Sequence, residues 1–331
     1  MKYTFGLILL FFIVCIGEAQ MPVTRPHHNL INASDQVAGT SIAADQQAKS
    51  WEAQKNGNLY NSKAWFNYYV WTARDKSLSD AERKKVLATI ISESHEYIAG
   101  KGDYYLMIFL HSGKKDSTAV YKALETAADK SIVYPYLIQY AIISGHDAEM
   151  AKWCRALDNT KCLSPWLYQY HYNALMSADT NAVIYASGLH DLVPMAVLQQ
   201  VYHIRKDTRL KYYDGHIPAR QQAYLCVSLG KEVLAEYPQA VCTGLLVKVH
   251  PQSSFDELKD HIEKSFDWHL LNSSQEWPQD VAQLYSNYLP GFIMLYRYYN
   301  AQNNSRANNL KLLIQKIAAR AGKQNIMHKI Q

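Results

Sequence analysis

The strongest constraint on this fold is a long succession of helix-length segments separated by short breaks. Between residues 43 and 178 the apolar side chains recur at three- and four-residue intervals, the spacing of one face of an α-helix. Gly100, Gly113, Gly145 and Asn159 interrupt this pattern. Helices of about ten to twenty residues joined by short turns pack most simply as consecutive hairpins. We therefore predict a helical repeat-like region over residues 43–178.

Several features of this region predict individual helices. Ser79 is followed three residues later by Glu82, the spacing of a capping box at a helix start. A faint internal similarity links the segments around Trp65 and Trp166, which are 101 positions apart, close to three tetratricopeptide units of about 34 residues. The Trp and Tyr stripe is most simply inter-helix packing, with a ligand surface as the alternative. The predicted helices span residues 62–75, 79–98, 104–111, 117–128, 135–144, 147–157 and 164–177.

The pattern changes after residue 178, where short apolar runs replace the helical spacing. Residues 182–186 form an apolar run, 193–203 return to helical spacing, and 208–213 alternate between polar and apolar side chains. A strand, a helix and a strand in this order form a βαβ unit with parallel strands. The expected fold class is mainly α, a helical hairpin (tetratricopeptide-like) array with an embedded small βαβ-type α/β module. A third strand over 244–250 and a helix over 255–269 complete this module, which spans residues 179–275.

The C-terminal region, residues 276–331, concentrates the positive charge. It carries seven Lys and Arg residues and no Asp or Glu after Asp280, whereas the whole chain has a net charge of +5. Helices are predicted over 277–299, interrupted near Pro290, and over 307–322. The basic surface is either the solvated face of a closing helix or a docking face for an anionic membrane surface or an acidic partner. Its residues are Lys311, Lys316, Arg320 and Lys323.

The first residues have the features of a secretory signal peptide. A positive charge precedes an apolar run over 5–16, and small residues precede a cleavage position after Ala19. The run is about 12 residues long, short of the roughly 18 that a membrane-spanning helix needs. Lipid attachment at Cys15 is the alternative. We predict a signal peptide over 1–19, a flexible leader over 20–42, and secretion across the inner membrane to a periplasmic or outer-envelope location.

Secretion changes what the later cysteines can do, because an oxidising compartment permits disulfides. Four cysteines follow the signal peptide and allow three pairings, of which Cys154–Cys162 with Cys226–Cys242 joins sequence neighbours. The alternative is that all four are small buried apolar side chains. No Cys-x-x-Cys pair occurs, so zinc ribbons and thioredoxin-like redox sites have no support.

One group of residues carries a chemical hypothesis. Ser187, Gly188, His190 and Asp191 follow the first predicted strand and precede a helix. Ligands of open parallel sheets bind beyond the carboxyl ends of strands, where helix N-terminal amides bind anions and a histidine can act as a base or ligand. The structural alternative is that Gly188 makes the turn and Asp191 caps the helix. No dinucleotide-binding loop, P-loop or nucleophile elbow occurs, and we predict no metal site, cofactor or catalytic set.

The stretch from His171 to Asp191, with Ile204–Asp207 beyond it, resembles a family of uncharacterised secreted proteins of the Bacteroidota. The same pattern occurs in the soluble C-terminal region of membrane proteins similar to protein O-mannosyltransferases. The resemblance covers roughly residues 60–300 and implies no glycosyl transfer, because it is confined to that soluble region. The family's polar turn, Asn-Gly-Asp-Asn-Asp-Thr, corresponds to residues 187–192, where only the glycine and the last acidic residue are retained. The further matching positions are 64–69, Leu198-Gln199, Leu245, Pro251 and 287–290.

These observations favour a secreted, non-enzymatic envelope scaffold, because helical arrays present extended binding surfaces. The second hypothesis is a carbohydrate-binding or glycosylation-accessory module, which rests on the resemblance and on the 25 Tyr and 7 Trp residues. The third is a hydrolase that uses His190 and Asp191. The expected partners are envelope proteins, with a glycan or an anionic membrane surface as alternatives. A net charge of +5 is too small to argue for nucleic acid.

Overall fold

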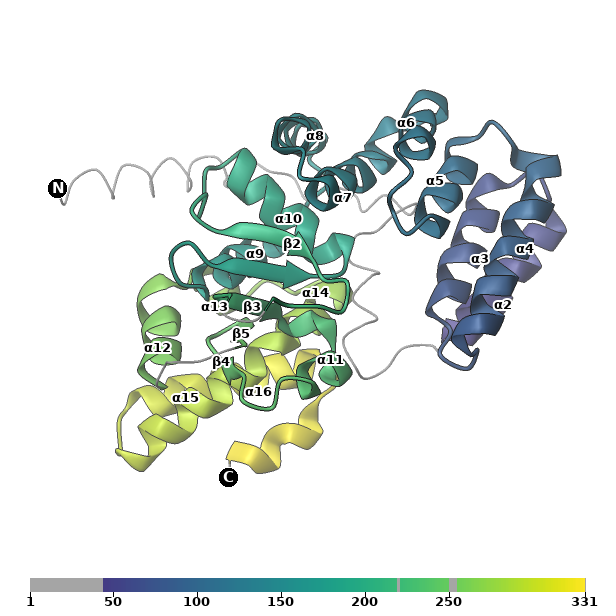
Figure 1. The fold of residues 1–331 in the computed structure, drawn as a ribbon. Coiled ribbons are helices and arrows are strands. Elements are labelled where there is room, and N and C mark those ends of the chain that lie inside the picture. The colour runs from purple at the N-terminus through teal and green to yellow at the C-terminus, as the bar shows by residue number, and fades with distance from the viewer. Residues whose placement is uncertain (1–43, 219–220, 250–254, 331) are drawn as a thin grey trace.

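The computed structural model describes residues 44–218, 221–249 and 255–330 of the 331-residue chain (Figure 1). The predicted signal peptide over 1–19 and the leader over 20–42 lie outside these residues. Within the described part of the chain, no helix combines the length and apolar character needed to cross a bilayer. The described chain is mainly helical and contains one small mixed sheet.

Five N-terminal helices form a unit that we call the arm. They are α2 (Ala44–Gly57), α3 (Ser62–Arg74), α4 (Asp80–Ile98), α5 (Gly102–His111) and α6 (Ser117–Thr126). Helix α2 packs along α3, α3 also contacts α4 and α5, and α5 packs on α6. The arm projects from the rest of the molecule, as the purple and blue helices in Figure 1 show. The predicted helices of this region are confirmed because their burial faces follow from local spacing alone.

The start of α4 shows how local chemistry sets a helix boundary. The Ser79 hydroxyl accepts a hydrogen bond from the Glu82 amide at 3.3 Å, and the Glu82 carboxylate accepts one from the Ser79 amide at 3.0 Å. Two amides that the helix leaves without partners are thereby satisfied. The predicted capping box is confirmed.

Replacing Ser79 with alanine is expected to lower the free energy of unfolding by about 1 kcal/mol, because the Glu82 amide loses its acceptor. Urea unfolding followed by circular dichroism measures the change. Ser92→Ala is the matched control, since Ser92 is exposed in the middle of the same helix. Alanine is the better helix former there, so the control is expected to be neutral or slightly stabilising. Equal losses in the two variants would contradict a role for the cap.

Three further helices join the arm to the sheet. Helix α7 (Tyr134–Ser144) ends at Gly145, whose φ of 70° lies in the left-handed region that glycine tolerates. Helices α8 (Asp147–Asn159) and α9 (Pro165–Met176) follow. All three pack on α10 (Leu189–Gln200), the helix that connects the first two strands. The packing therefore does not change at residue 178, where the sequence suggested a boundary.

The sheet contains the predicted βαβ unit. Strands β1 (Val183–Ala186) and β2 (Arg209–Tyr212) are parallel, with Ile184 opposite Leu210, and α10 connects them. Strand β5 (Leu246–Lys248) lies within the predicted third strand. The sequence did not indicate β3 (Ala223–Cys226) or β4 (Val241–Cys242). All four residues of β3 are buried, and a short continuous apolar run has no period that separates strand from helix.

The order of the strands is β2-β1-β3-β5-β4. Strand β3 pairs with β1 in parallel, and β5 runs antiparallel to both β3 and β4. The parallel βαβ unit is therefore extended by an antiparallel edge, and β1 lies between β2 and β3. This placement brings the segments that follow β1 and β3 to the same edge of the sheet.

Of the C-terminal helices, α15 and α16 lie below the sheet in the view of Figure 1. The predicted helix over 255–269 is shorter, because α12 (Phe255–Asp260) passes into a π-helical turn (His261–Ser265) before α13 (His269–Asn272). Helix α14 (Gln279–Tyr285) and α15 (Leu289–Ala301) are separate, as predicted, and Pro290 lies in the first turn of α15, where no amide partner is needed. Helix α16 (Arg306–Arg320) closes the body, which we define as α7 to the C-terminus.

One hydrophobic core runs from Trp65 in the arm to Ile317 in α16, without a gap at residues 178 or 276. The two segments that suggested a repeat have different surroundings. The Trp65 indole donates to the Leu59 carbonyl and stacks on Tyr97, whereas Trp166 of α9 meets Tyr285 of α14 edge-on. The helical hairpins are present, but these two tryptophans do not occupy equivalent positions.

Candidate functional site

The predicted site lies where the connections of two neighbouring strands diverge. Helix α10 follows β1 and belongs to the main core, which contains Ile184 and Ala186 on one face of the sheet. The short helix α11 (Lys231–Ala235) follows β3 and covers Val183 and Tyr185 on the opposite face. Divergence of this kind opens a crevice at the carboxyl edge of α/β sheets. Ser187 and Gly188 come from β1 at this point, and Ser228 comes from β3.

The crevice is filled by a buried polar cluster centred on Asp191. The Ser228 hydroxyl donates a hydrogen bond to Asp191 Oδ2. His190 Nε2 lies 3.2 Å from Asp191 Oδ2, and His171 Nε2 lies 3.5 Å from Asp191 Oδ1. The His171 ring is oriented by its Nδ1, which donates to the Leu167 carbonyl at 2.8 Å. The side chains of His171, His190 and Asp191 are at most 3% exposed.

Asp191 is held as a carboxylate anion in this cluster. Burial by itself would raise the pKa of Asp191, but the adjacent His190 and His171 outweigh it and hold the pKa well below the usual range. The neighbouring Tyr170 and Cys226 show the opposite effect. Burial raises the pKa of both groups, and the negative charge of Asp191 raises it further. The cluster therefore contains one fixed negative charge, on Asp191, and its neighbours Tyr170 and Cys226 stay protonated.

Gly188 is required here for space, because its φ of −106° is open to any residue. A Cβ at Gly188 would lie 2.2 Å from Cε1 and 2.3 Å from Nδ1 of His190, so the imidazole lies directly over the glycine. The interpretation of Asp191 as a helix cap is wrong. The N-cap residue of α10 is Gly188, no side chain caps this helix, and Asp191 bonds across the sheet edge instead.

This arrangement differs from a catalytic Ser-His pair. Ser228 donates to a carboxylate and not to an imidazole, so it lacks the histidine that would take its proton during attack. Asp191 and Ser228 are both only 2% exposed, which leaves no access for a substrate in this structure. The cluster joins α9, α10 and the end of β3: Ser228 donates a hydrogen bond to the buried Asp191 carboxylate, and His171 and His190 face it without a regular hydrogen bond.

A second polar cluster lies at the opposite edge of the sheet. One ligand atom from each of Asp179, Glu257 and His261 lies within 4.8 Å of the other two, a spacing suited to a metal ion. The Lys248 ammonium already lies between the carboxylates, 2.7 Å from Asp179 Oδ2 and 3.2 Å from Glu257 Oε1. His261 Nδ1 donates to the Thr243 carbonyl at 3.0 Å. The lysine supplies the positive charge, and the cluster is an ion-pair network.

Asp179 gives this network a defined pH dependence. Partial burial would raise the pKa of Asp179, but hydrogen bonds from Lys248, Tyr224 and Gln222 lower it to about 2. Since an unfolded Asp has a pKa of about 3.9, the folded value is the lower one. The carboxylate therefore contributes stability above about pH 4, and this contribution is lost as the pH falls toward 2.

Asp179→Asn is accordingly expected to lower the urea unfolding midpoint at about pH 6.5 and to have a much smaller effect at about pH 2.5. Parallel titrations of the two proteins at both pH values measure the difference. In a Lys248→Met background the Asn substitution is expected to lose most of its effect at about pH 6.5, because the partner charge is absent. A difference that is the same at both pH values would contradict this assignment.

Most of the predicted basic surface has internal contacts. Lys316 Nζ donates to the Leu271 and Ser273 carbonyls at 2.7 Å, and Arg320 donates to the Gln275 carbonyl at 3.0 Å. Lys323 Nζ donates to the Ser286 hydroxyl at 2.9 Å. Burial lowers the pKa of Lys316 and Lys323. These three side chains tie α16 and the turn after it to residues 271–275 and to Ser286, and Lys311 is half-buried.

The structure contains neither predicted disulfide. Cys154, Cys226 and Cys242 are buried or half-buried, and burial raises the pKa of each thiol. Cys162 is exposed. The buried cysteines match the alternative interpretation, in which they act as small apolar side chains.

The comparisons with known proteins add no functional assignment. A scan against protein-family models finds no matching family, and searches of curated proteins and solved structures return no significant match.

Proposed function

We propose that this protein is a secreted, non-enzymatic scaffold of the cell envelope that binds partner proteins through its arm, a tetratricopeptide-like helical array. The observation that carries the proposal is the contrast between the two parts of the molecule. The polar groups with the most perturbed environment, around Asp191, are buried in the body. Helices α2 to α6 extend away from the body and leave much of their surface to solvent (Figure 1). Extended helical arrays bind proteins over such surfaces.

The aromatic residues favour protein binding over carbohydrate binding. A sugar-binding surface needs aromatic faces that solvent can reach. About half of the described Tyr and Trp side chains are buried and nearly all of the others are half-buried, and Tyr60 is the one that is largely exposed, at 74%. The abundance of Tyr and Trp, which supported the carbohydrate hypothesis, is therefore explained by core packing.

Tyr60 is well suited to anchor a partner. It lies in the turn between α2 and α3 and meets Tyr97 edge-on, with ring centroids 5.8 Å apart. Tyr97 stacks on Trp65, and Lys55 Nζ lies 4.2 Å from the Trp65 ring centre. The exposed ring is thus supported by a rigid aromatic layer. Rigid tyrosines that present a large apolar area are typical of protein-interface hot spots.

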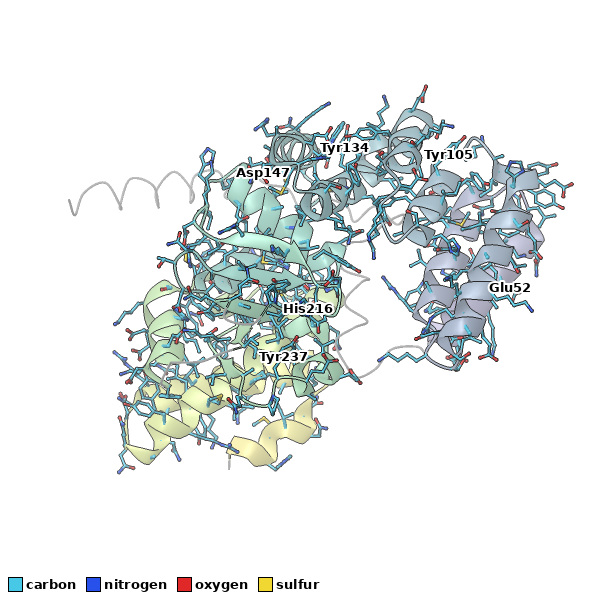
Figure 2. The ribbon with its side chains drawn as sticks, viewed as in Figure 1. Glu52, Tyr105, Tyr134, Asp147, His216 and Tyr237 are labelled. Carbon is cyan, nitrogen blue, oxygen red and sulfur yellow. The ribbon has the colours of Figure 1, made fainter. Side chains whose placement is uncertain are left out.

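A photocrosslinking amino acid placed at Tyr60 of the full chain tests the proposal in the native envelope. The same amino acid at His216 is the matched control, because His216 is exposed and belongs to the body. Figure 2 labels His216 there, and Glu52 and Tyr105 on the arm. We expect a defined protein adduct from position 60 and none from 216. The adduct partner, once purified, is expected to bind the Tyr60→Ala variant at least about tenfold more weakly. Identical adducts from both positions, or unchanged affinity, would refute the arm as the binding surface.

A further inference from the structure

A groove lies on the body between the π-helical turn and α13 on one side and α15 and α16 on the other. Its volume is about 790 Å³, within the range of roughly 300–1,000 Å³ that is typical of small-molecule sites. Its floor is apolar, formed by Trp268, Leu271, Leu295 and Leu313. Leu312 in its lining is 66% exposed, so its apolar side chain is accessible to a ligand in the groove.

The charges around this groove are mostly positive. Of the four charged residues that line it, Lys264, Arg306 and Lys316 are basic and only Glu263 is acidic. Lys316 Nζ donates to two carbonyls, and among the described residues no carboxylate lies within ion-pair distance of it. Lys264 pairs with Asp260 at 2.8 Å and Arg306 pairs with Glu263, so the groove combines an apolar lining with Lys316 and the exposed Arg306 as its available basic groups.

Arg306 has the geometry to bind a carboxylate. Its side chain is 62% exposed, and Nη1 donates to Glu263 Oε1. Nη1 also lies 3.4 Å from the Tyr299 hydroxyl. Within the described part of the chain, both contacts use the same nitrogen, so the Nε and Nη2 edge remains for a ligand. That edge can bind both oxygens of a carboxylate with two parallel hydrogen bonds.

We propose that this groove binds a single-chain carboxylate amphiphile, a molecule with a long apolar tail and an anionic carboxylate head. The tail lies on the floor formed by Trp268, Leu271, Leu295 and Leu313, and the carboxylate pairs with Arg306. The proposal concerns a different part of the molecule from the arm and does not depend on the protein-binding function. Glu263 competes with the ligand head for the guanidinium, so the site is weakened by a residue of the protein itself.

Dodecanoate and dodecyltrimethylammonium, both below their micelle concentrations, are suitable probes in titration calorimetry with the full chain. They have similar tails and opposite head charges. We expect saturable binding of one dodecanoate per protein and no comparable binding of the cation. Equal affinity for the two amphiphiles, no dodecanoate binding, or binding only to vesicles that contain anionic phospholipid would overturn the proposal.

Four substitutions distinguish the head and tail contributions. Arg306→Gln is expected to weaken dodecanoate binding about tenfold, and Glu263→Gln is expected to strengthen it several-fold because the guanidinium is released. Leu312→Ala is expected to weaken it by a factor of about 2–5 through lost tail contact. Lys311→Gln removes the same charge from α16 outside the groove lining and is expected to leave the affinity unchanged. If Glu263→Gln weakens binding, or if Arg306→Gln and Lys311→Gln act alike, the carboxylate does not pair with Arg306.

Discussion

Replacing Asp191 with alanine is expected to lower the free energy of unfolding by about 3–5 kcal/mol, because it leaves the polar groups around it buried without their partner. His171 and His190 lose the carboxylate that faces them, and the Ser228 hydroxyl loses its acceptor. Domains of this kind are stabilised by only about 5–15 kcal/mol in total, so the loss is a large fraction. Urea unfolding at about pH 7, followed by circular dichroism and tryptophan fluorescence, measures it.

Two milder variants show whether charge or shape is responsible. Asp191→Asn keeps the shape and removes the charge, and Ser228→Ala removes one donor and is expected to cost about 1–3 kcal/mol. Because the folded pKa of Asp191 lies below its unfolded value, its stabilising effect is present above about pH 4 and is lost only in stronger acid. The deficit of the Asn variant is therefore expected to persist down to about pH 4. An Ala variant within about 1 kcal/mol of the wild type would show that the cluster does not stabilise the fold.

Phe292→Ala is expected to cost about 3–5 kcal/mol through the loss of buried area and the cavity that remains. Phe292 is fully buried between two aromatic rings. Its centroid lies 5.2 Å from that of Tyr288 and 5.4 Å from that of Trp268, and both pairs are stacked. The side chain thus joins α15 to Trp268 at the start of α13 and to Tyr288 just before α15. A single substitution is therefore expected to weaken the packing among these three segments.

Met294→Ala is the matched control for Phe292→Ala. It lies two residues away in the same helix and is 38% exposed, so its truncation leaves no enclosed cavity. A change below about 1 kcal/mol is expected from the small loss of buried area. The same urea titration measures both variants. Comparable losses of stability at the two positions would mean that α15 is sensitive to any truncation and that the stacked aromatic rings make no particular contribution.

Helices α3 to α6 of the arm could be predicted from the sequence because their determinants are local, whereas α2 was not among the predicted helices. The spacing of apolar side chains along α3 and the Ser79–Glu82 pair act within a few residues of each other. The β1–α10–β2 unit was also readable, because the period changes from helical to extended and back within one short stretch. The end of α7 at Gly145 could likewise be predicted, because it depends on one residue that tolerates a left-handed backbone.

The candidate sites could be read only in part, because their partners come from distant segments. His190 and Asp191 were visible as neighbours after a strand, but Ser228 is 37 positions away and reaches Asp191 only because β3 pairs with β1. Asp179 and Glu257 are brought together by Lys248 of β5, a strand whose position in the sheet no local pattern specifies. The sequence of a fully buried strand such as β3 does not predict which strand it pairs with, because the packing of both of its faces decides the pairing.

The sequence by itself thus determined the helical character of the chain, the capping box of α4 and the existence of a parallel βαβ unit. These follow from the backbone and side-chain preferences of short segments. Only the tertiary structure decided the strand order, the burial of Asp191 and the use of Lys316 as an internal donor to Leu271 and Ser273. The physical reason is that a charged side chain can either face solvent or meet buried partners, and the packing of distant segments determines which of these occurs.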